Sequence, residues 1–315
     1  MTIWADIAGA STVPVDGHSV VTLGVFDGVH RGHQKLLADV CSEADRRGVA
    51  TVAMTFWPHP GAALSPGGAP AQLTTIERRV ELLHAYGADQ VRVLAFSATM
   101  AAWAPETFIE RVVLAECGAQ HVVVGENFRF GAKAAGNVEY LAQFGASHGF
   151  TAVGHQLDGD GVAFSSTRVR AAVANGQVEE AAQMLGRLPE VEGEVVHGDH
   201  RGRELGFPTA NIVVEAGFAV PADGVYAGWL VRASQERLPA AISVGTNPTF
   251  EGVVGRRIES YVLDSDNLDL YGETVRIEFA HRLRAMEPFD STEALVNQMS
   301  LDVAQTRELL ASFAS

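Results

Sequence analysis

The chain has 315 residues, of which 47% are hydrophobic and 19% are charged. That length suits about two domains, each with a core of its own, and the composition excludes a disordered chain. The formal net charge of −15 argues against a general nucleic-acid binder, because such proteins carry a basic patch. A small anionic ligand held by a few local cations stays compatible with it.

The sequence carries no sign of a membrane span or of a secretory signal. No apolar run approaches the ~18 residues that a span needs, and the first residues lack a basic segment. The two cysteines, Cys41 and Cys117, lie in segments with helical spacing, which favours reduced thiols and a cytoplasmic protein. Neither lysine, Lys35 or Lys133, belongs to a GxxxxGK[ST] loop, so any ATP must be held in another way.

In the first half of the chain, short apolar runs rich in β-branched residues alternate with amphipathic segments. The segment 60–71, rich in Gly, Ala and Pro, is expected to be a surface loop. The alternation predicts a parallel sheet covered by helices on both faces. Ligands of such sheets bind at the carboxyl ends of strands, so we expect chemistry just after residues 26, 56 and 125. The expected strands are 19–26, 49–56, 90–96, 120–125 and 150–156, and the expected helices are 31–47, 75–86, 105–116 and 137–148.

Near residue 187 the pattern changes from long helices to closely spaced strands. Short strands separated by Gly, Pro, Asp and Asn turns predict a small antiparallel β-barrel, followed by a helix at 291–312. We therefore expect two domains, 1–186 and 187–315. The expected elements are two short helices within 166–186 and strands at 191–197, 210–215, 224–232, 239–245, 257–263 and 273–281. The apolar face of the last helix is expected at Leu295, Met299, Val303, Leu309 and Leu310.

The segment GVFDGVHRGH, residues 24–33, joins the first expected strand to the first helix. A helix N-terminus offers unpaired N–H groups and the positive end of a dipole, which suits an anion. His30 and His33 share one face of the first turn, where two imidazoles can stabilise a phosphoryl group in transfer. Gly28 and Gly32 let a phosphate approach the backbone. The alternative is a tight strand–helix turn with two solvated histidines.

Two further segments of the first half suit a nucleotide. FSSTRVR at 164–170 places hydroxyls and arginines at a helix start, where they can hold a triphosphate, although an ordinary N-cap is the alternative. VGENFRFG at 124–131 follows a strand, and its Asn127 and two phenylalanines suit a phosphate and a flat ring, although a plain loop is also compatible. Together with the histidine loop, the first segment resembles the HxGH plus SSTxxR signature of nucleotidyltransferases, which move an adenylyl or cytidylyl group with release of pyrophosphate.

Two segments of the expected barrel carry chemistry. GDHRGRELGFPTAN at 198–211 can wrap phosphates as a flap, although a turn with a solvated arginine pair is the alternative. Thr209 and Asn211 face the same side of an extended segment and offer oxygen ligands that suit Mg²⁺. RRIESYVLD at 256–264 alternates polar and apolar residues, which places Glu259 on a solvent face. If that face lines a cavity instead, Glu259 can act as a general base on a substrate hydroxyl.

These motifs occur in this order over residues 19–264, together with FWPHP, GVYAG and VGTNPTF. The combination resembles the bifunctional riboflavin kinase/FMN adenylyltransferases of bacteria, the prokaryotic FAD synthetases. The resemblance implies an α/β protein with a Rossmann-like nucleotidyltransferase domain that transfers AMP from ATP to FMN, giving FAD and pyrophosphate. It also implies a β-barrel riboflavin kinase domain that transfers the γ-phosphoryl group of ATP to the ribityl 5′-hydroxyl of riboflavin. Mg²⁺ would serve both steps.

The resemblance also implies roles for individual residues. His30 and His33 would bind and polarise the ATP phosphates, and Glu259 would be the general base of the kinase. Thr209 and Asn211 would hold Mg²⁺ and phosphate. The nucleotide site of adenylyl transfer would further include Gly24, Phe26, Asp27, Gly28, Gly32, Asn127, Ser165, Ser166, Thr167 and Arg170. The ATP and flavin sites of the kinase would further include Gly198, Arg201, Gly202, Arg203, Gly206, Phe207 and Pro208.

Three residues depart from the pattern of many relatives: His200 stands where Gly is common, Phe164 where Val or Ile is common, and Asn247 where Arg is common. Three other functions stay open. A nucleotidyltransferase for another phosphate acceptor would leave the GFPTAN segment without a purpose. A flavin-binding protein with one decayed module would not need the intact site residues. A flavin-dependent oxidoreductase would purify yellow and would not need HxGH. The sequence leaves self-association open.

Overall fold

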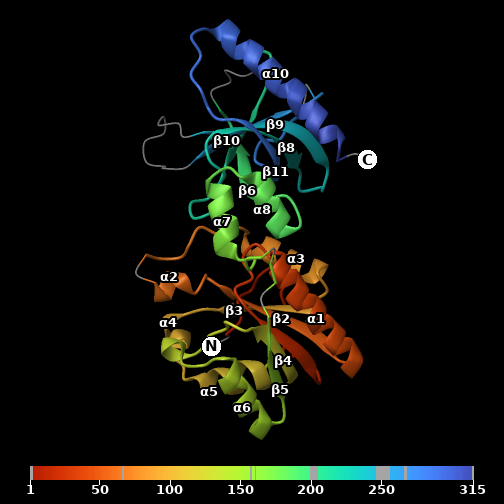
Figure 1. Cartoon of the computed structure of the whole chain (residues 1–315), viewed down its shortest axis with the longest axis vertical. Helices are drawn as coiled ribbons and strands as arrows, with labels where there is room; N and C mark the ends of the chain where they lie inside the picture. The colour runs from red at the N-terminus through yellow and green to blue at the C-terminus, as the bar shows by residue number, and fades with distance from the viewer. Residues whose placement is uncertain are drawn as a thin grey trace. The chain divides into compact units, whose positions relative to one another are not determined.

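The computed structural model describes residues 3–65, 67–156, 158–159, 161–198, 205–245, 256–265 and 268–313. The chain divides into two compact units (Figure 1). The first unit comprises Met1–Pro70 and Thr74–Ser165, and the second comprises Ala71–Leu73 and Ser166–Ser315. Packing thus groups the two short helices before residue 187 with the second unit. The expected division of the activities at residue 186 stays a prediction.

The first unit is built on a five-stranded parallel sheet with the order β3-β2-β1-β4-β5. Successive residues of a strand point to opposite faces, so Val20 enters one buried cluster and Val21 another. This confirms the expected parallel sheet with a core on each side. The strands are β1 (Ser19–Leu23), β2 (Ala50–Trp57), β3 (Gln90–Ala95), β4 (Ala119–Gly125) and β5 (Thr151–His155).

Helices cover both faces of this sheet (Figure 1). Helices α1 (Arg31–Arg47) and α3 (Ile76–Ala85) supply apolar side chains to one cluster. Helix α5 (Pro105–Phe108), the π-helix η1 (Ile109–Leu114) and helix α6 (Val138–His148) supply the other. The long helices therefore lie close to where the periodicity predicts them.

Two segments of the first unit differ from expectation. The expected loop at 60–71 contains one helical turn, α2 (Gly61–Leu64). The expected helix at 105–116 changes from α to π geometry within its length. Over six residues, apolar spacing is nearly the same for the two geometries, so the sequence pattern does not separate them. The remaining short helices are α4 (Ala98–Ala101) and the 3-10 helix η2 (Ala132–Ala134).

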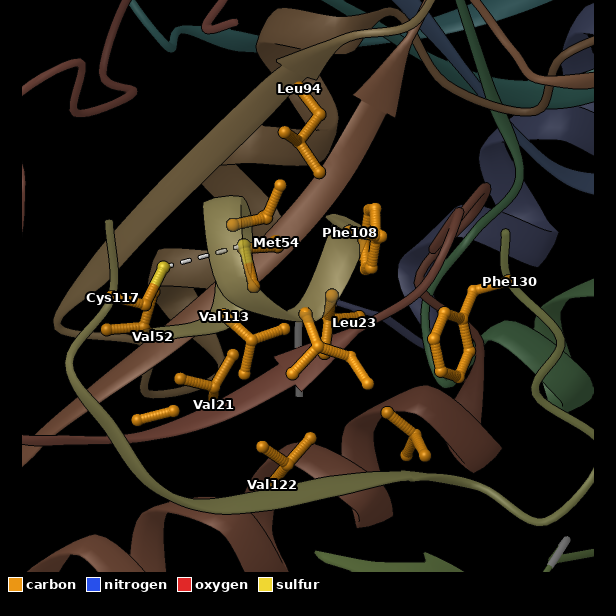
Figure 2. Close-up of a cluster of buried hydrophobic side chains, with 14 of the residues drawn as sticks. Val21, Leu23, Val52, Met54, Leu94, Phe108, Val113, Cys117, Val122 and Phe130 are labelled. Carbon is orange, nitrogen blue, oxygen red and sulfur yellow. Dashed lines mark hydrogen bonds between the residues drawn. The ribbon is translucent and has the colours of Figure 1, made fainter. Parts of the chain in front are cut away.

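Figure 2 shows the cluster on the α5–η1–α6 side of the sheet. Side chains from β1, β2 and β4 meet Phe108 and Val113 there, all of them buried. Cys117 lies in the same cluster, with its sulfur 3.6 Å from that of Met54. Burial raises the pKa of the Cys117 thiol to about 12, so it stays protonated and behaves as a small apolar side chain.

The second unit is a closed antiparallel barrel with the strand order β10-β7-β6-β11-β8-β9. This confirms the predicted barrel, and β11 runs three residues beyond its expected end. The helices are α7 (Ser166–Ala174), α8 (Val178–Leu185) and α10 (Thr292–Ala311). The strands are β6 (Glu190–Val196), β7 (Ala210–Val213), β8 (Gly224–Val231), β9 (Arg237–Gly245), β10 (Arg257–Val262) and β11 (Thr274–Arg284).

The buried face of helix α10 is not the one that its apolar residues predict. Its most buried residues are Asp302, Thr306 and Leu310, so a charged side chain faces the barrel in the middle of the helix. The expected apolar residues Leu295 and Met299 are only half-buried. The sequence pattern missed this arrangement, because the partner that compensates Asp302 is Arg284 on another element, at the end of β11.

Candidate active sites

The histidine loop follows β1, at the carboxyl edge of the parallel sheet. β1 ends at Leu23, earlier than expected, and the chain then turns sharply. Phe26 and Val29 have φ angles of 53° and 39°, in the left-handed region that non-glycine residues rarely adopt. The Val29 N–H donates to the carbonyl oxygen of Phe26, which closes the turn. His30 is the N-cap of α1 and makes no side-chain capping bond, so the helix N-terminus is not closed by its own cap.

The two histidines of the loop lie against each other. Their ring centroids are 3.6 Å apart with an interplanar angle of 22°, and Phe26 meets His33 edge-on at 5.1 Å. A Cβ atom on Gly32 would lie 3.2 Å from the His30 ring, so glycine gives that ring its room. A Cβ atom on Gly24 would meet the Phe26 ring at 3.0 Å, which is also tight.

His33 is held in its neutral form. Burial lowers its pKa well below the usual value, and the nearby charges of His30 and Arg79 lower it further. Its Nδ1 atom is buried and has no hydrogen-bond partner among the described residues. A neutral imidazole with an unused polar atom suits a ligand that brings its own donors and acceptors.

Asp27, one of the residues expected in the nucleotide site, holds the loop against the rest of the domain. Its side chain is 1% exposed, and Oδ1 accepts bonds from the Thr74 N–H and from Arg79 Nη2, both at 3.3 Å. Arg79 is fully buried. Sequence reasoning missed Arg79, although its position on the apolar face of α3, between Ile76 and Leu83, was a usable signal.

The Asn127 loop follows β4, which is the neighbour of β1 in the sheet. The strand order reverses between these two strands, so both loops leave the sheet at its topological switch point, where α/β sheets bind ligands. Asn127 is exposed. Phe128 and Phe130 stack at 5.6 Å, but Phe130 is buried in the core, so its ring serves packing.

The FSSTRVR segment starts α7. Ser165 is the last residue of the first unit, and Ser166 and Thr167 open the helix. Thr167 is exposed, and Arg170 Nε donates to the carbonyl oxygen of Ala71 at 2.6 Å. The hydroxyls and the arginine are thus gathered at a helix start, as expected.

Among the described residues of the barrel unit, two sizeable cavities adjoin Thr209. One, of about 250 Å³, is mostly apolar and is lined by Phe207, Glu259 and Tyr261 together with residues of α10. The other, of about 330 Å³, is more polar and is lined by residues that include Pro208, Asp269 and Tyr271. Thr209 lines both cavities. The sequence allowed Glu259 to lie either on a solvent face or against a cavity. In the structure it lines a cavity.

Glu259 and Asn211 are neighbours across two paired strands. The register of β7 and β10 sets Glu259 opposite Asn211. Arg257 lies two residues before Glu259, on the same face, and Arg257 Nε is 2.9 Å from Asn211 Oδ1 and 3.2 Å from Glu259 Oε1. A Cβ atom on Gly198 would lie 2.2 Å from Asn211 Nδ2, so only glycine leaves room for this amide. Sequence reasoning missed Arg257 as a site residue.

Part of the expected kinase site lies outside the described residues. Arg201, Gly202 and Arg203 belong to that part, as do the departures His200 and Asn247. Gly206 and Phe207 are described, and the Phe207 ring meets Tyr261 edge-on at 5.3 Å.

The residues that line the 250 Å³ cavity also include a charged pair. Arg284, at the end of β11, contacts both oxygens of Asp302 on α10, with its shortest contact at 2.8 Å. The carboxylate also accepts a bond from Gln298. Asp302 is nearly fully buried, and this pair joins the terminal helix to the barrel beside the cavity.

The chain joins a nucleotide-type loop on a parallel sheet to a barrel in which Glu259 lines an apolar cavity and Thr209 lines this cavity and a second one. These features define a two-domain transferase. The family model of FAD synthetase matches residues 13–168, and that of riboflavin kinase matches residues 185–310. The chain belongs to the family of bifunctional riboflavin kinase/FMN adenylyltransferases. It converts riboflavin to FMN and FMN to FAD, with ATP as co-substrate of both steps.

Individual relatives support this assignment. The bifunctional riboflavin kinase/FMN adenylyltransferase of Escherichia coli (strain K12) is 34% identical over 309 residues, covering 98% of this chain and 97% of the relative. That of Pseudomonas fluorescens is 36% identical over 293 residues, 93% of each chain. A crystal structure of a protein named macrolide-efflux protein, from Streptococcus pneumoniae, has a TM-score of 0.84 and 33% identity, covering 94% of this chain and 95% of that one. In the part of this chain that the structure describes, no helix is long and apolar enough to cross a membrane.

Proposed function

We propose that residues 1–186 carry adenylyl transfer at the histidine loop and that residues 187–315 carry riboflavin phosphorylation on the β7–β10 face of the barrel. The observation that carries the kinase half is the position of Thr209, which lines both cavities. The apolar cavity suits the flavin ring, and the polar cavity suits ATP. The 5′-hydroxyl and the γ-phosphate would then meet beside Thr209 and Glu259.

In the kinase step, Glu259 accepts the proton of the riboflavin 5′-hydroxyl as its oxygen attacks the γ-phosphorus atom of ATP. ADP leaves and FMN is formed. Such reactions depend mainly on positioning and on neutralisation of charge. The half-exposed carboxylate already faces the cavity proposed for the flavin.

Mg²⁺ is part of this proposal. The described residues include no group of three His, Cys, Asp or Glu side chains that could hold a metal ion. The ion would complete its shell with phosphate oxygens and water, as Mg²⁺ commonly does. The Thr209 hydroxyl is a hard oxygen donor and fits it. The Asn211 side-chain oxygen is of the same type, and it would give up one of its two bonds from Arg257 to the ion. When bound, the ion neutralises charge on the transferring phosphoryl group.

In the adenylyl step, FMN phosphate attacks the α-phosphorus atom of ATP and pyrophosphate leaves. The stacked His30 and His33 donate hydrogen bonds to the triphosphate, and the N-terminus of α1 adds backbone donors. Ser165, Ser166, Thr167 and Arg170 hold the same triphosphate, and Asn127 contacts nucleotide or flavin phosphate. The family model of FAD synthetase, which spans residues 13–168, includes all of these positions except Arg170.

The test is a time course of flavins separated by chromatography, with riboflavin, ATP and Mg²⁺ as substrates. We expect FMN first and FAD later. His33→Ala should lower FAD formation by on the order of 10²–10³ while FMN still forms, and Glu259→Gln should do the reverse when activity is measured from riboflavin and from FMN separately. Loss of both activities in either folded variant would contradict the assignment of the two steps to separate regions.

We also propose a cytoplasmic location. It is supported by Cys41 and Cys117, which are both free thiols.

A further inference from the structure

Arg257 contacts both of the polar side chains assigned to the kinase site on paired strands. Its Nε atom lies 2.9 Å from Asn211 Oδ1 and 3.2 Å from Glu259 Oε1, and its Nη2 atom donates to the same Asn211 oxygen. The Arg257 side chain is 20% exposed, so these contacts are partly shielded from water. One cation thus contacts both the amide and the carboxylate.

The strand register explains why the three groups meet. Arg257 and Glu259 are two residues apart on β10 and therefore share a face, and Asn211 lies opposite Glu259 on β7. Ile258, between them, points into the barrel and is fully buried. Cross-strand neighbours on one face lie within reach of a long side chain.

The contacts act differently on the two partners. With Glu259, Arg257 forms an ion pair at one carboxylate oxygen, Oε1, and the attraction draws that oxygen toward the guanidinium group. Its two donors engage the side-chain oxygen of Asn211, so this amide also has one defined orientation. A planar guanidinium can hold two acceptors at once, whereas an ammonium group holds them with less geometric definition.

We propose that Arg257 is the positioning residue of the kinase site, which orients Glu259 and Asn211 for the attack of the riboflavin 5′-hydroxyl. The inference rests on the proposed role of Glu259. Arg257 acts through these two side chains and not as a binding group for nucleotide phosphate. A carboxylate displaced by about 1 Å can cost on the order of 10²-fold in rate, so loss of Arg257 should lower kcat and leave substrate affinity nearly unchanged.

The test compares Arg257→Leu and Arg257→Lys with Arg237→Leu as a matched control. Arg237 also forms an ion pair on the barrel, with Glu278 at 2.8 Å, and lines neither of the two kinase cavities. We expect Arg257→Leu to lower kcat for FMN formation at least about tenfold, with KM for riboflavin within about twofold. Arg257→Lys should recover part of kcat, Arg237→Leu should match the wild type, and FAD formation from FMN should be unchanged in all three.

Binding without turnover gives an independent readout. The affinity for riboflavin without ATP or Mg²⁺, measured by titration calorimetry, should change less than about threefold in Arg257→Leu, because positioning affects the reacting geometry and not ground-state binding of the flavin. A larger loss would overturn the inference, since Arg257 would then contribute to binding. An unchanged kcat would overturn it as well.

A double-mutant cycle separates this inference from the function on which it rests. If Arg257 acts through Glu259, adding Arg257→Leu to Glu259→Gln should lower kcat for FMN formation little further. If the two residues act independently, the two reductions in kcat should multiply. If Glu259→Gln alone keeps wild-type kinase activity, the role of Glu259 and this inference both fail. If Glu259→Gln is inactive but Arg257→Leu is not, this inference fails alone.

Discussion

The two sites of this chain are held in different ways. In the α/β unit, the backbone of the histidine loop contains two residues in the left-handed region. The loop is held by an ion pair between its own Asp27 and Arg79 of α3, both buried. In the barrel, the reacting side chains stand on a strand face beside open cavities, and Glu259 is 38% exposed. The histidine loop is therefore anchored in the core of its domain, whereas the kinase side chains lie on the outer face of barrel strands. Substitutions in the buried pair that holds the histidine loop should lower the unfolding free energy. Substitutions among the kinase side chains should mainly lower the rate of the reaction.

The largest effect on stability is expected behind the histidine loop. Arg79→Leu leaves the carboxylate of Asp27 buried without its cation, which should lower the unfolding free energy of the first unit by about 3–5 kcal/mol. Urea unfolding followed by tryptophan fluorescence measures this, because Trp4, Trp57 and Trp103 lie in the first unit.

The matched control is Arg78→Leu, one residue earlier. Arg78 pairs with Glu81, which is largely exposed, so the expected loss is about 0.5 kcal/mol. Similar losses for the two variants would show that the loop does not depend on its buried pair, and the contrast between the two sites would then disappear.

A smaller effect is expected at the wall of the apolar cavity in the barrel. Asp302→Ala removes the acceptor for Arg284 and Gln298, which should cost about 1–3 kcal/mol. It should also raise KM for riboflavin, because α10 lines the cavity. Leu301→Ala is the control: this neighbour is 63% exposed and should change stability by less than about 0.5 kcal/mol. An unchanged KM in Asp302→Ala would indicate that α10 does not shape the flavin site.

The smallest effect is a dependence of stability on pH in the first unit. The folded chain holds the pKa of His33 below its usual 6.5, so the unfolded chain takes up the proton first as the pH falls. The unfolding free energy should therefore decrease below pH 6.5, by at most about 1.4 kcal/mol per pH unit from this group, until the folded pKa is reached. His33→Gln should make the dependence shallower when urea unfolding is compared at pH 7.5 and 5.5. An equal slope in the two proteins would mean that the burial of His33 is not maintained in solution.

Local sequence patterns predicted most elements of both units, because each buried face repeats with the period of its own helix or strand. Helix α1 and its end at Gly48 illustrate this: the apolar positions and the left-handed glycine lie within one continuous segment. The same local reasoning missed Asp302 on α10, since a buried carboxylate looks like a surface residue until its partner on β11 is known. It also did not separate the π-helix η1 from an α-helix.

The candidate sites show the same limit. The loops that carry His30, His33, Thr209 and Asn211 were recognisable because each motif is local. For Glu259, alternation placed the side chain on the outer face of its strand but did not say what lies beyond that face. The closed barrel together with helix α10 supplies the answer, because the residues that complete the cavity lie up to 54 positions before and 44 positions after Glu259 in the chain.

By itself, the sequence determined the order of the two modules, the positions of their motifs and the family to which they point. Tertiary structure alone decided which polar partner each charged side chain meets. Arg79 reaches Asp27 across 52 residues, and Arg257 reaches Asn211 across 46. The reason is physical. Hydrophobic periodicity is a property of each single helix or strand and can be recognised in its sequence. The partner of a buried or partly buried charge depends on which elements pack together, and a local sequence pattern does not contain that information.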